Sequence, residues 1–402
     1  MKYQFADCLI DLATQELHRN GEAVSVEPQV FELLVFLVEN REKLVSYDEL
    51  ITSVWRGRVV SDSAIAARIS AARKAMGDNG KKQSVIKTVS RKGFKFLPPV
   101  RIIPDPVLLL SGNRMAMEER HLAPGFQQVR FCQSTDGTNI AFALTGSGIP
   151  LLRTGHWLTH LEHDWQSPIW RPLLDELGQR FEVVRYDQRG NGLSDWDVQD
   201  FSFERFGEDL EAVVEAAGLD RFVLYATSQG VPVAVKYATQ NPQRVSHLVL
   251  HGGYVTGRLA RQDKAEIEQG QAILTLIKHG WGLAGSPFLK SFSAMYIPDS
   301  TGEQMDSLAE LQKLTTNADN ALALRKAVDN FDVSELLARV NVKTLVMHAR
   351  NDGVHPLEQG RLLASGISGS EFVMLESANH ALLPQERAWP RFFLELDRFV
   401  NT

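Results

Sequence analysis

The chain has 402 residues, of which 44% are hydrophobic and 23% charged, a balance that excludes wholesale disorder. This length predicts two or three domains. Cys8 and Cys132 are too few for a disulfide framework and have no histidine cluster beside them, so we expect a reducing, cytoplasmic environment. The apolar stretch 101–111 falls short of the ~20 residues that a membrane span needs. We therefore expect a soluble protein with no membrane partner.

The net charge of −6 is unevenly distributed along the chain. Residues 1–100 hold 15 lysines and arginines against 12 acidic residues, and residues 55–96 alone hold 11 basic side chains against two acids. Such a local excess of positive charge in an acidic protein indicates a polyanionic partner.

The first hundred residues predict short strands followed by three helices. Alternating segments flank Asn20-Gly21, a strong tight-turn signal, and indicate a small antiparallel sheet. Pro28 suits the first position of a helix. Ser46 and Glu49 have the spacing of a capping box, which predicts a second helix starting there.

The third predicted helix, over residues 62–77, has a narrow apolar stripe. Ile65, Ile69, Ala72 and Met76 fall within about 60° of one another at 100° per residue, so we expect them to be buried. The outward face then consists mainly of small residues edged by basic ones, namely Ser63, Ala67, Ser70 and Lys74 with Arg68 and Arg73 on the flanks. This face favours approach to a nucleic-acid groove over an ordinary solvated surface. A basic hairpin over residues 84–97, able to straddle backbone phosphates, is predicted to follow.

Residues 3–97 resemble a winged helix-turn-helix domain of the OmpR/PhoB type. The matching stretches are LIDLATQELHRNGEAVSVEP, LVSYDELITSVWRGRVVSDSAIAARISAARKAMGD and VIKTVSRKGFKF. The resemblance implies that the third helix enters the major groove of double-stranded DNA and that the wing touches the minor groove or backbone. It implies DNA-binding roles for Arg68, Ser70, Arg73, Lys74, Thr88, Arg91 and Lys92. Ser90 departs from the pattern, because many members carry an arginine directly after the Thr-Val pair.

A proline-rich segment without periodicity separates this region from a differently patterned one. We predict a DNA-binding domain over residues 1–100, a linker over 101–126 and a second domain over 127–402. In the second domain, apolar runs of four to eight residues alternate with helical segments. This pattern predicts an α/β fold with a doubly wound, mostly parallel sheet.

One predicted strand of this sheet ends in the stretch YATSQGVPVA, residues 225–234. Small residues flank Ser228 between a strand and a helix, which is the setting of a nucleophile elbow. Asp352 and His380 each follow a later predicted strand, and the order Ser228, Asp352, His380 is that of an α/β-hydrolase triad. Taken singly, Asp352 could cap a turn and His380 could pack in a loop.

Residues 127–402 resemble the α/β-hydrolase family. The resemblance implies a serine hydrolase triad, an oxyanion hole formed by the amides of Gln229 and His156, and a structural role for Asp187. Thr154-Gly155 stands where the family usually has a His-Gly pair. A helical cap is expected over residues 254–335. The expected ligand-pocket residues are Trp157, Trp281, Phe288, Phe292 and Tyr296.

Residues 155–165, GHWLTHLEHDW, also invite a metal-site interpretation through His156, His160, His163 and Asp164. Such a run is more often pocket wall and loop, so we predict no metal and no other cofactor.

These features together predict a transcription regulator in which a hydrolase-like domain senses a small apolar ester, lactone or similar effector. One alternative is a working serine esterase whose DNA-binding domain localises or autoregulates it. Another is that the basic domain docks RNA or protein. We expect a homodimer, because winged helices of this kind often bind direct repeats in tandem.

Overall fold

The computed structural model describes residues 2–103 and 126–401, apart from residues 12–15, 25, 42, 55–59, 61, 80, 90–91, 99, 262 and 283–286. The chain divides into two compact units, Met1–Ala116 and Met117–Thr402. None of the helices in these described ranges is both long enough and apolar enough to cross a membrane.

The N-terminal unit contains an antiparallel sheet of five strands in the order β4-β3-β2-β1-β7. The strands are β1 (Lys2–Phe5), β2 (Cys8–Asp11), β3 (Glu16–Arg19), β4 (Glu22–Val24) and β7 (Arg101–Ile103). Asn20 and Gly21 both have positive φ, 53° and 82°, and form the predicted tight turn between β3 and β4.

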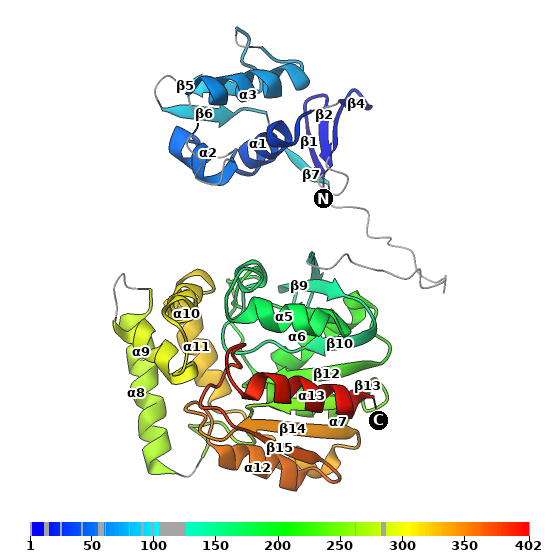
Figure 1. The fold of residues 1–402 in the computed structure, drawn as a ribbon, viewed down its shortest axis with the longest axis vertical. Helices are drawn as coiled ribbons and strands as arrows, with labels where there is room; N and C mark the ends of the chain where they lie inside the picture. Colours follow the sequence, from blue (N-terminus) through cyan, green and yellow to red (C-terminus); the bar gives the residue numbers. More distant parts are fainter. Residues whose placement is uncertain are drawn as a thin grey trace. The chain divides into compact units, whose positions relative to one another are not determined.

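Three helices follow the first four strands (Figure 1): α1 (Pro28–Glu39), α2 (Tyr47–Val54) and α3 (Asp62–Ala75). The predicted capping box precedes α2, since the Ser46 amide donates to Glu49 Oε2 at 2.7 Å and the Glu49 amide donates to Ser46 Oγ at 3.2 Å. The predicted stripe of α3 is confirmed as core. Its residues Ile65, Ile69, Ala72 and Met76 are all buried.

A two-stranded hairpin completes this unit, formed by β5 (Ile86–Val89) and β6 (Gly93–Phe96). Gly93 has φ +140°, and a β-carbon there would lie 1.9 Å from the Val45 carbonyl oxygen. Glycine thus lets the hairpin pair closely with the segment before α2, where Val45 and Phe94 exchange backbone hydrogen bonds.

The C-terminal unit is built on an eight-stranded sheet of order β15-β14-β13-β12-β10-β11-β9-β8. The strands are β8 (Gln128–Gln133), β9 (Asn139–Gly146), β10 (Ile149–Arg153), β11 (Phe181–Tyr186), β12 (Phe222–Thr227), β13 (Val245–His251), β14 (Lys343–Ala349) and β15 (Glu371–Leu375). All pairings are parallel from β11 through β15, whereas β9 pairs antiparallel with β8 and β11. The predicted α/β fold with a mostly parallel sheet is confirmed.

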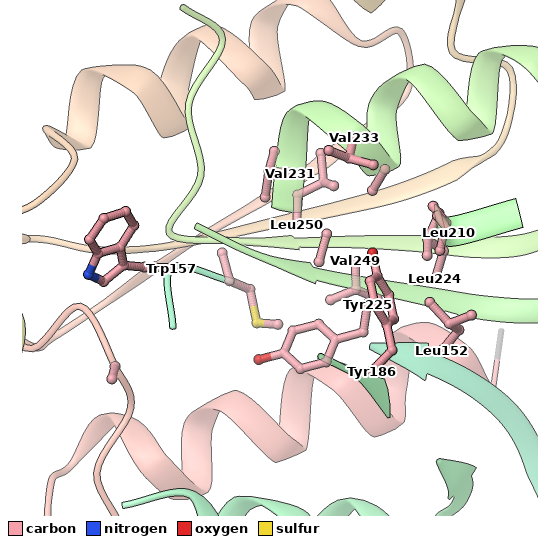
Figure 2. Close-up of a cluster of buried hydrophobic side chains, with 14 of the residues drawn as sticks. Leu152, Trp157, Tyr186, Leu210, Leu224, Tyr225, Val231, Val233, Val249 and Leu250 are labelled. Carbon is pink, nitrogen blue, oxygen red and sulfur yellow. The ribbon is translucent and has the colours of Figure 1, made fainter. Parts of the chain in front are cut away.

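Helices cover both faces of this sheet (Figure 1). They are α5 (Trp170–Gly178), α6 (Phe203–Ala217), α7 (Gly230–Gln240), α12 (Leu357–Gly366) and α13 (Ala388–Val400), with a short α4 (Leu161–Asp164) after β10. Figure 2 shows α7, which carries Val231 and Val233, on one side of the central strands and α13, in faint red, on the other. Because the central strands β9 to β14 are covered on both faces, most of their side chains are buried and apolar, whereas the edge strands β8 and β15 are more exposed.

The described residues between β13 and β14, where the sequence predicts a cap, form four helices and a 3-10 helix. They are α8 (Lys264–Gly280), α9 (Pro287–Tyr296), α10 (Gly302–Leu314), α11 (Ala318–Val328) and η1 (Ser334–Arg339). Figure 1 shows α8 to α11 grouped together beside the sheet. Their buried side chains, such as Ile277 and Leu311, belong to the same apolar cluster as the sheet.

Candidate functional site

Ser228 occupies a strained turn between β12 and α7. Its φ of +54° lies in the left-handed region, which residues with a side chain rarely adopt. The turn is fixed by the Ser228 amide, which donates to the His251 carbonyl oxygen at 3.0 Å, and by Gly230, which packs against Thr154 and Gly155 of the loop after β10. This strand, turn and helix form the nucleophile elbow that the sequence predicts.

His380 and Asp352 form a buried hydrogen-bonded pair. His380 Nδ1 lies 2.7 Å from Asp352 Oδ2, and the other carboxylate oxygen accepts the amides of Val354 at 2.8 Å and His355 at 3.0 Å. Burial opposes ionisation of Asp352, but attraction to His380, the hydrogen bond with that ring and the nearby His348 lower the pKa of the carboxyl below its ordinary value. The pair leaves His380 Nε2 free of the carboxylate, as a general base requires.

The loop that carries His380 is held by the cap. The His380 amide donates to the Tyr296 carbonyl oxygen at 2.8 Å, and the Tyr296 ring contacts the imidazole edge to face at 5.3 Å. His355 approaches the same imidazole at 5.3 Å. Burial lowers the pKa of His355 well below its ordinary value, so it remains neutral near pH 7.

The structure brings Ser228 and His380 to the wall of one cavity. The free space is narrow, about 40 Å³, enough for a few water molecules. Its wall is mostly apolar and comes from both sheet and cap. The lining residues are Arg153, His156, Trp157, Leu158, Trp170, Leu173, Tyr225, Thr227, Ser228, His251, Phe292, Tyr296, Leu308, Gln312, His380, Ala381 and Leu382.

Two backbone amides near the elbow are free to bind an oxyanion. Neither the Gln229 amide nor the His156 amide donates to an acceptor within the described part of the chain. The side chain of Gln229 is held by Gln188, whose own amide group donates to the His156 carbonyl at 2.9 Å. The contact between Gly230 and Gly155 places the two loops side by side. This arrangement has the elements of an oxyanion hole.

Three of the five predicted pocket residues line the cavity: Trp157, Phe292 and Tyr296. Trp281 does not. It lies one layer behind, where its ring packs on Trp157 and its Nε1 donates to the Thr316 carbonyl at 3.1 Å. Position 288 belongs to α9, but the side chain of Phe288 lies outside the described residues.

Sequence reasoning missed several lining residues, above all Arg153, Tyr225 and Gln312. The available signal for Arg153 was a charged residue at the end of the apolar run PLLRT, directly before the loop that carries His156. A charge in a fully buried strand needs a partner or a ligand.

The histidine-rich run after β10 does not assemble a metal site within the described ranges. His160 Nδ1 accepts the His163 amide at the start of α4, and Asp164 faces Arg185 at 3.7 Å. Asp187 is buried and accepts the backbone amides of Leu161 and Leu193, which fits a structural role.

In the N-terminal unit, α3 presents an exposed face containing Ser70 and Lys74. Arg68, at its edge, forms an ion pair with Glu27. On the hairpin, Lys92 is exposed, whereas Arg91 lies outside the described residues. Ser70 and Lys74 are thus accessible to solvent, and their predicted contact with DNA stays a prediction.

Arg73 has a different environment from the one expected for a groove contact. It is only 7% exposed and donates to the Ile86 carbonyl at 2.7 Å and to Thr88 Oγ1 at 2.7 Å. It therefore ties α3 to the first strand of the hairpin. This placement favours a role for Arg73 and Thr88 in orienting the wing rather than in touching DNA.

Comparisons with known proteins agree with this architecture. Residues 163–386, more than half of the chain, match the model for the alpha/beta hydrolase fold. The chain belongs to this family. Residues 21–96 match the model described as transcriptional regulatory protein, C terminal. The protein is thus a transcriptional regulatory DNA-binding domain of the OmpR/PhoB type joined to a hydrolase-fold domain.

Individual relatives each match one part of the chain. The transcriptional activator CadC of Escherichia coli is 34% identical over 93 residues, which are 23% of this chain and 18% of that protein. A putative carbamate hydrolase, RutD of Klebsiella pneumoniae, is 25% identical over 53% of this chain and 79% of its own. An esterase from Exiguobacterium antarcticum superposes with a TM-score of 0.58 at 23% identity, covering 68% of this chain and 99% of the esterase.

Proposed function

We propose that the protein is a transcription regulator whose hydrolase-fold unit binds a small, largely apolar ester, lactone or related effector and controls DNA binding. The observation that carries this proposal is a cavity lined by a strained Ser228 and by a His380 paired with Asp352, in a chain that also has a regulatory DNA-binding domain. A sensor needs a ligand site and an output, and this chain has residues suited to both.

The geometry supports acyl chemistry at the same site. Ser228 Oγ attacks a carbonyl carbon while His380 Nε2 accepts its proton, and Asp352 holds the Nδ1–H tautomer of the imidazole. The free amides of Gln229 and His156 stabilise the oxyanion of the tetrahedral intermediate. His380 then returns the proton to the leaving oxygen. Water then hydrolyses the acyl-Ser228 intermediate in a second cycle. The complete reaction either destroys the effector or produces it from a precursor.

Mass spectrometry after exposure of the full chain to 4-nitrophenyl acetate tests the proposal. We expect stoichiometric acetylation of Ser228, slow release, and a shifted affinity for DNA taken from upstream of the protein's own coding sequence. Fast catalytic release with unchanged DNA affinity would support the second candidate, a working esterase with a fused DNA-binding domain. No acylation at Ser228 would contradict both.

The proposed DNA partner requires sequence preference. Footprinting on the same upstream DNA should protect a defined segment, and two adjacent protected repeats would support the proposed homodimer. A salt-sensitive footprint without sequence preference would instead favour a docking role for the basic domain.

A further inference from the structure

Arg153 is a buried cation in the wall of the candidate catalytic cavity. It is the last residue of β10, only 3% exposed, and it lines the cavity together with Ser228 and His380. Its strand register places it beside Tyr225 of β12, three residues before Ser228. Three residues of extended chain span about 10 Å, so Arg153 lies about that far from Ser228 along the strand direction.

The guanidinium of Arg153 has no anionic partner within the described chain. Its Nε is buried without a hydrogen-bond acceptor, and its guanidinium carbon lies over the Trp170 ring, 5.0 Å from the ring centre. Two acidic groups act on it electrostatically, Tyr225 and Asp164. Burial raises the pKa of the Tyr225 phenol, which is therefore neutral near pH 7, and Asp164 is the ion-pair partner of Arg185 instead.

The other buried arginines that the structure describes are all paired. Each donates to a carboxylate, a carbonyl or an amide oxygen at 3.0 Å or less: Arg73, Arg185, Arg189, Arg258, Arg261 and Arg325. An unpaired buried charge carries a large desolvation penalty that hydrogen bonds normally offset. Arg153 departs from this rule at a ligand cavity, so a bound anion is the natural partner.

The rest of the wall indicates what kind of anion fits. None of the described lining residues is an aspartate or glutamate, and, histidines aside, Arg153 is the one cation among them, so a monoanion balances the charge. Three other lining residues also carry a buried polar atom without a hydrogen-bond partner, namely Tyr296 Oη, Gln312 Oε1 and His156 Nε2. A guanidinium fork matches the two oxygens of a carboxylate.

We propose that the effector or substrate of this cavity carries a carboxylate, which Arg153 binds while Ser228 faces an ester or lactone carbonyl of the same molecule. This inference rests on the proposed function and narrows its ligand class to small, largely apolar acids. In the acylation step, the Ser228 Oγ–carbonyl bond forms, the ester oxygen leaves with the proton carried by His380, and the carboxylate remains unchanged.

Two esters of similar size test this inference on the full chain: 4-nitrophenyl butyrate, which is neutral, and mono-4-nitrophenyl succinate, which is anionic. The measured quantity is the second-order rate constant for acylation of Ser228, followed by nitrophenolate release and by intact mass. We expect the succinate ester to react at least about tenfold faster, the effect of a charged hydrogen bond. Equal rates would overturn the inference.

Three variants assign the effect to the side chain. Arg153→Met should reduce the preference for the anionic ester by about tenfold to a hundredfold, and Arg153→Lys should retain part of it. Arg361→Met removes one positive charge from an exposed site on α12 and should leave the preference unchanged. If Arg153→Met slows both esters equally, Arg153 is not an anion site.

A binding measurement keeps the test valid if neither ester acylates Ser228. That outcome contradicts the proposed function but not the anion site, which then depends on the binding of butyrate alone. Butyrate, a monoanion, should raise the melting temperature of the wild-type chain and of the Arg361→Met variant but not that of Arg153→Met. A thermal scan without ligand shows whether Arg153→Met is folded. Lack of a shift in the folded wild type would overturn the inference.

Discussion

Gly230 and Thr154 touch so closely that a β-carbon at position 230 would lie 2.1 Å from the Thr154 hydroxyl oxygen. The first residue of α7 thus sets the distance between the nucleophile elbow and the loop that carries the His156 amide. Both proposed oxyanion donors depend on this one contact.

Replacing Gly230 with alanine should push the two loops apart. We expect Gly230→Ala to lower the rate of Ser228 acylation at least tenfold and to destabilise the chain by about 1–3 kcal/mol, since the clash is with a packed neighbour. Gly207→Ala is the matched control, because a β-carbon there meets nothing within 4 Å in the middle of α6. It should be neutral or stabilising by up to about 1 kcal/mol in urea unfolding. Equal effects of the two changes would contradict this account.

The strain at Ser228 predicts that function and stability oppose each other at this position. Ser228→Gly removes both the hydroxyl and the cost of the left-handed backbone, so it should abolish acylation while raising the free energy of unfolding by about 0.5–1 kcal/mol. Ser228→Ala should abolish acylation without that gain. Urea unfolding and intact mass measure the two properties. A destabilised glycine variant would show that the turn is not strained.

Asp78 links the end of α3 to the start of the hairpin and makes the N-terminal unit sensitive to acid. Burial opposes its ionisation, but hydrogen bonds from the amides of Val85, Ser84 and Asn79 lower the pKa of its carboxyl to about 2. A depressed pKa contributes stability above the unfolded value near 3.8 that is lost as the pH falls toward 2. The loss should reach about 2 kcal/mol.

Hydrogen exchange of the α3 and β5 amides measures this effect separately from the second unit. We expect their protection to fall between pH 4 and pH 2 in the wild type. The fall should be smaller in Asp78→Asn, which starts from a lower protection at pH 6. Identical pH profiles would refute a role for this carboxylate.

Neighbouring basic residues of α3 should affect DNA binding in different ways. Lys74→Ala removes an exposed charge, so it should weaken binding to the upstream DNA and reduce the slope of log affinity against log salt by about 0.9, with stability unchanged within about 0.5 kcal/mol. Arg73→Met should destabilise the unit by about 1–3 kcal/mol, because it leaves the Ile86 carbonyl without its donor.

Fluorescence anisotropy at several salt concentrations, with urea unfolding, separates these two roles. Lys290→Ala controls for loss of a lysine on the cap, where its side chain is 72% exposed. An undiminished stability of Arg73→Met together with a reduced salt slope would mean that Arg73 contacts phosphate after all.

The parts of this molecule that could be predicted from sequence are those encoded by local pattern. The stripe of Ile65, Ile69 and Ala72 follows from helical periodicity, and the box of Ser46 and Glu49 from the chemistry of a helix start. The elbow around Ser228 was recognisable because the tight turn between strand and helix requires small flanking residues, such as Ala226 and Gly230.

The parts that escaped prediction depend on which side chain meets which across the fold. Arg73 lies next to Ala72 on the helix, and only the return of the hairpin supplies the Ile86 carbonyl that buries it. Trp281 is as apolar as Trp157, yet packing places it one layer away from the cavity. Whether Arg153 has a hydrogen-bond partner depends on the side chains that every neighbouring strand places beside it, which the local sequence does not show.

The hydrogen bond from the His380 amide to the Tyr296 carbonyl joins the cap to the residue proposed as general base. Tyr296 ends α9, and its ring also forms part of the cavity wall. Under the proposed function, an effector that displaces α9 would therefore displace the imidazole of His380 as well. Ligand binding and the reactivity of Ser228 would then be coupled through this single backbone hydrogen bond.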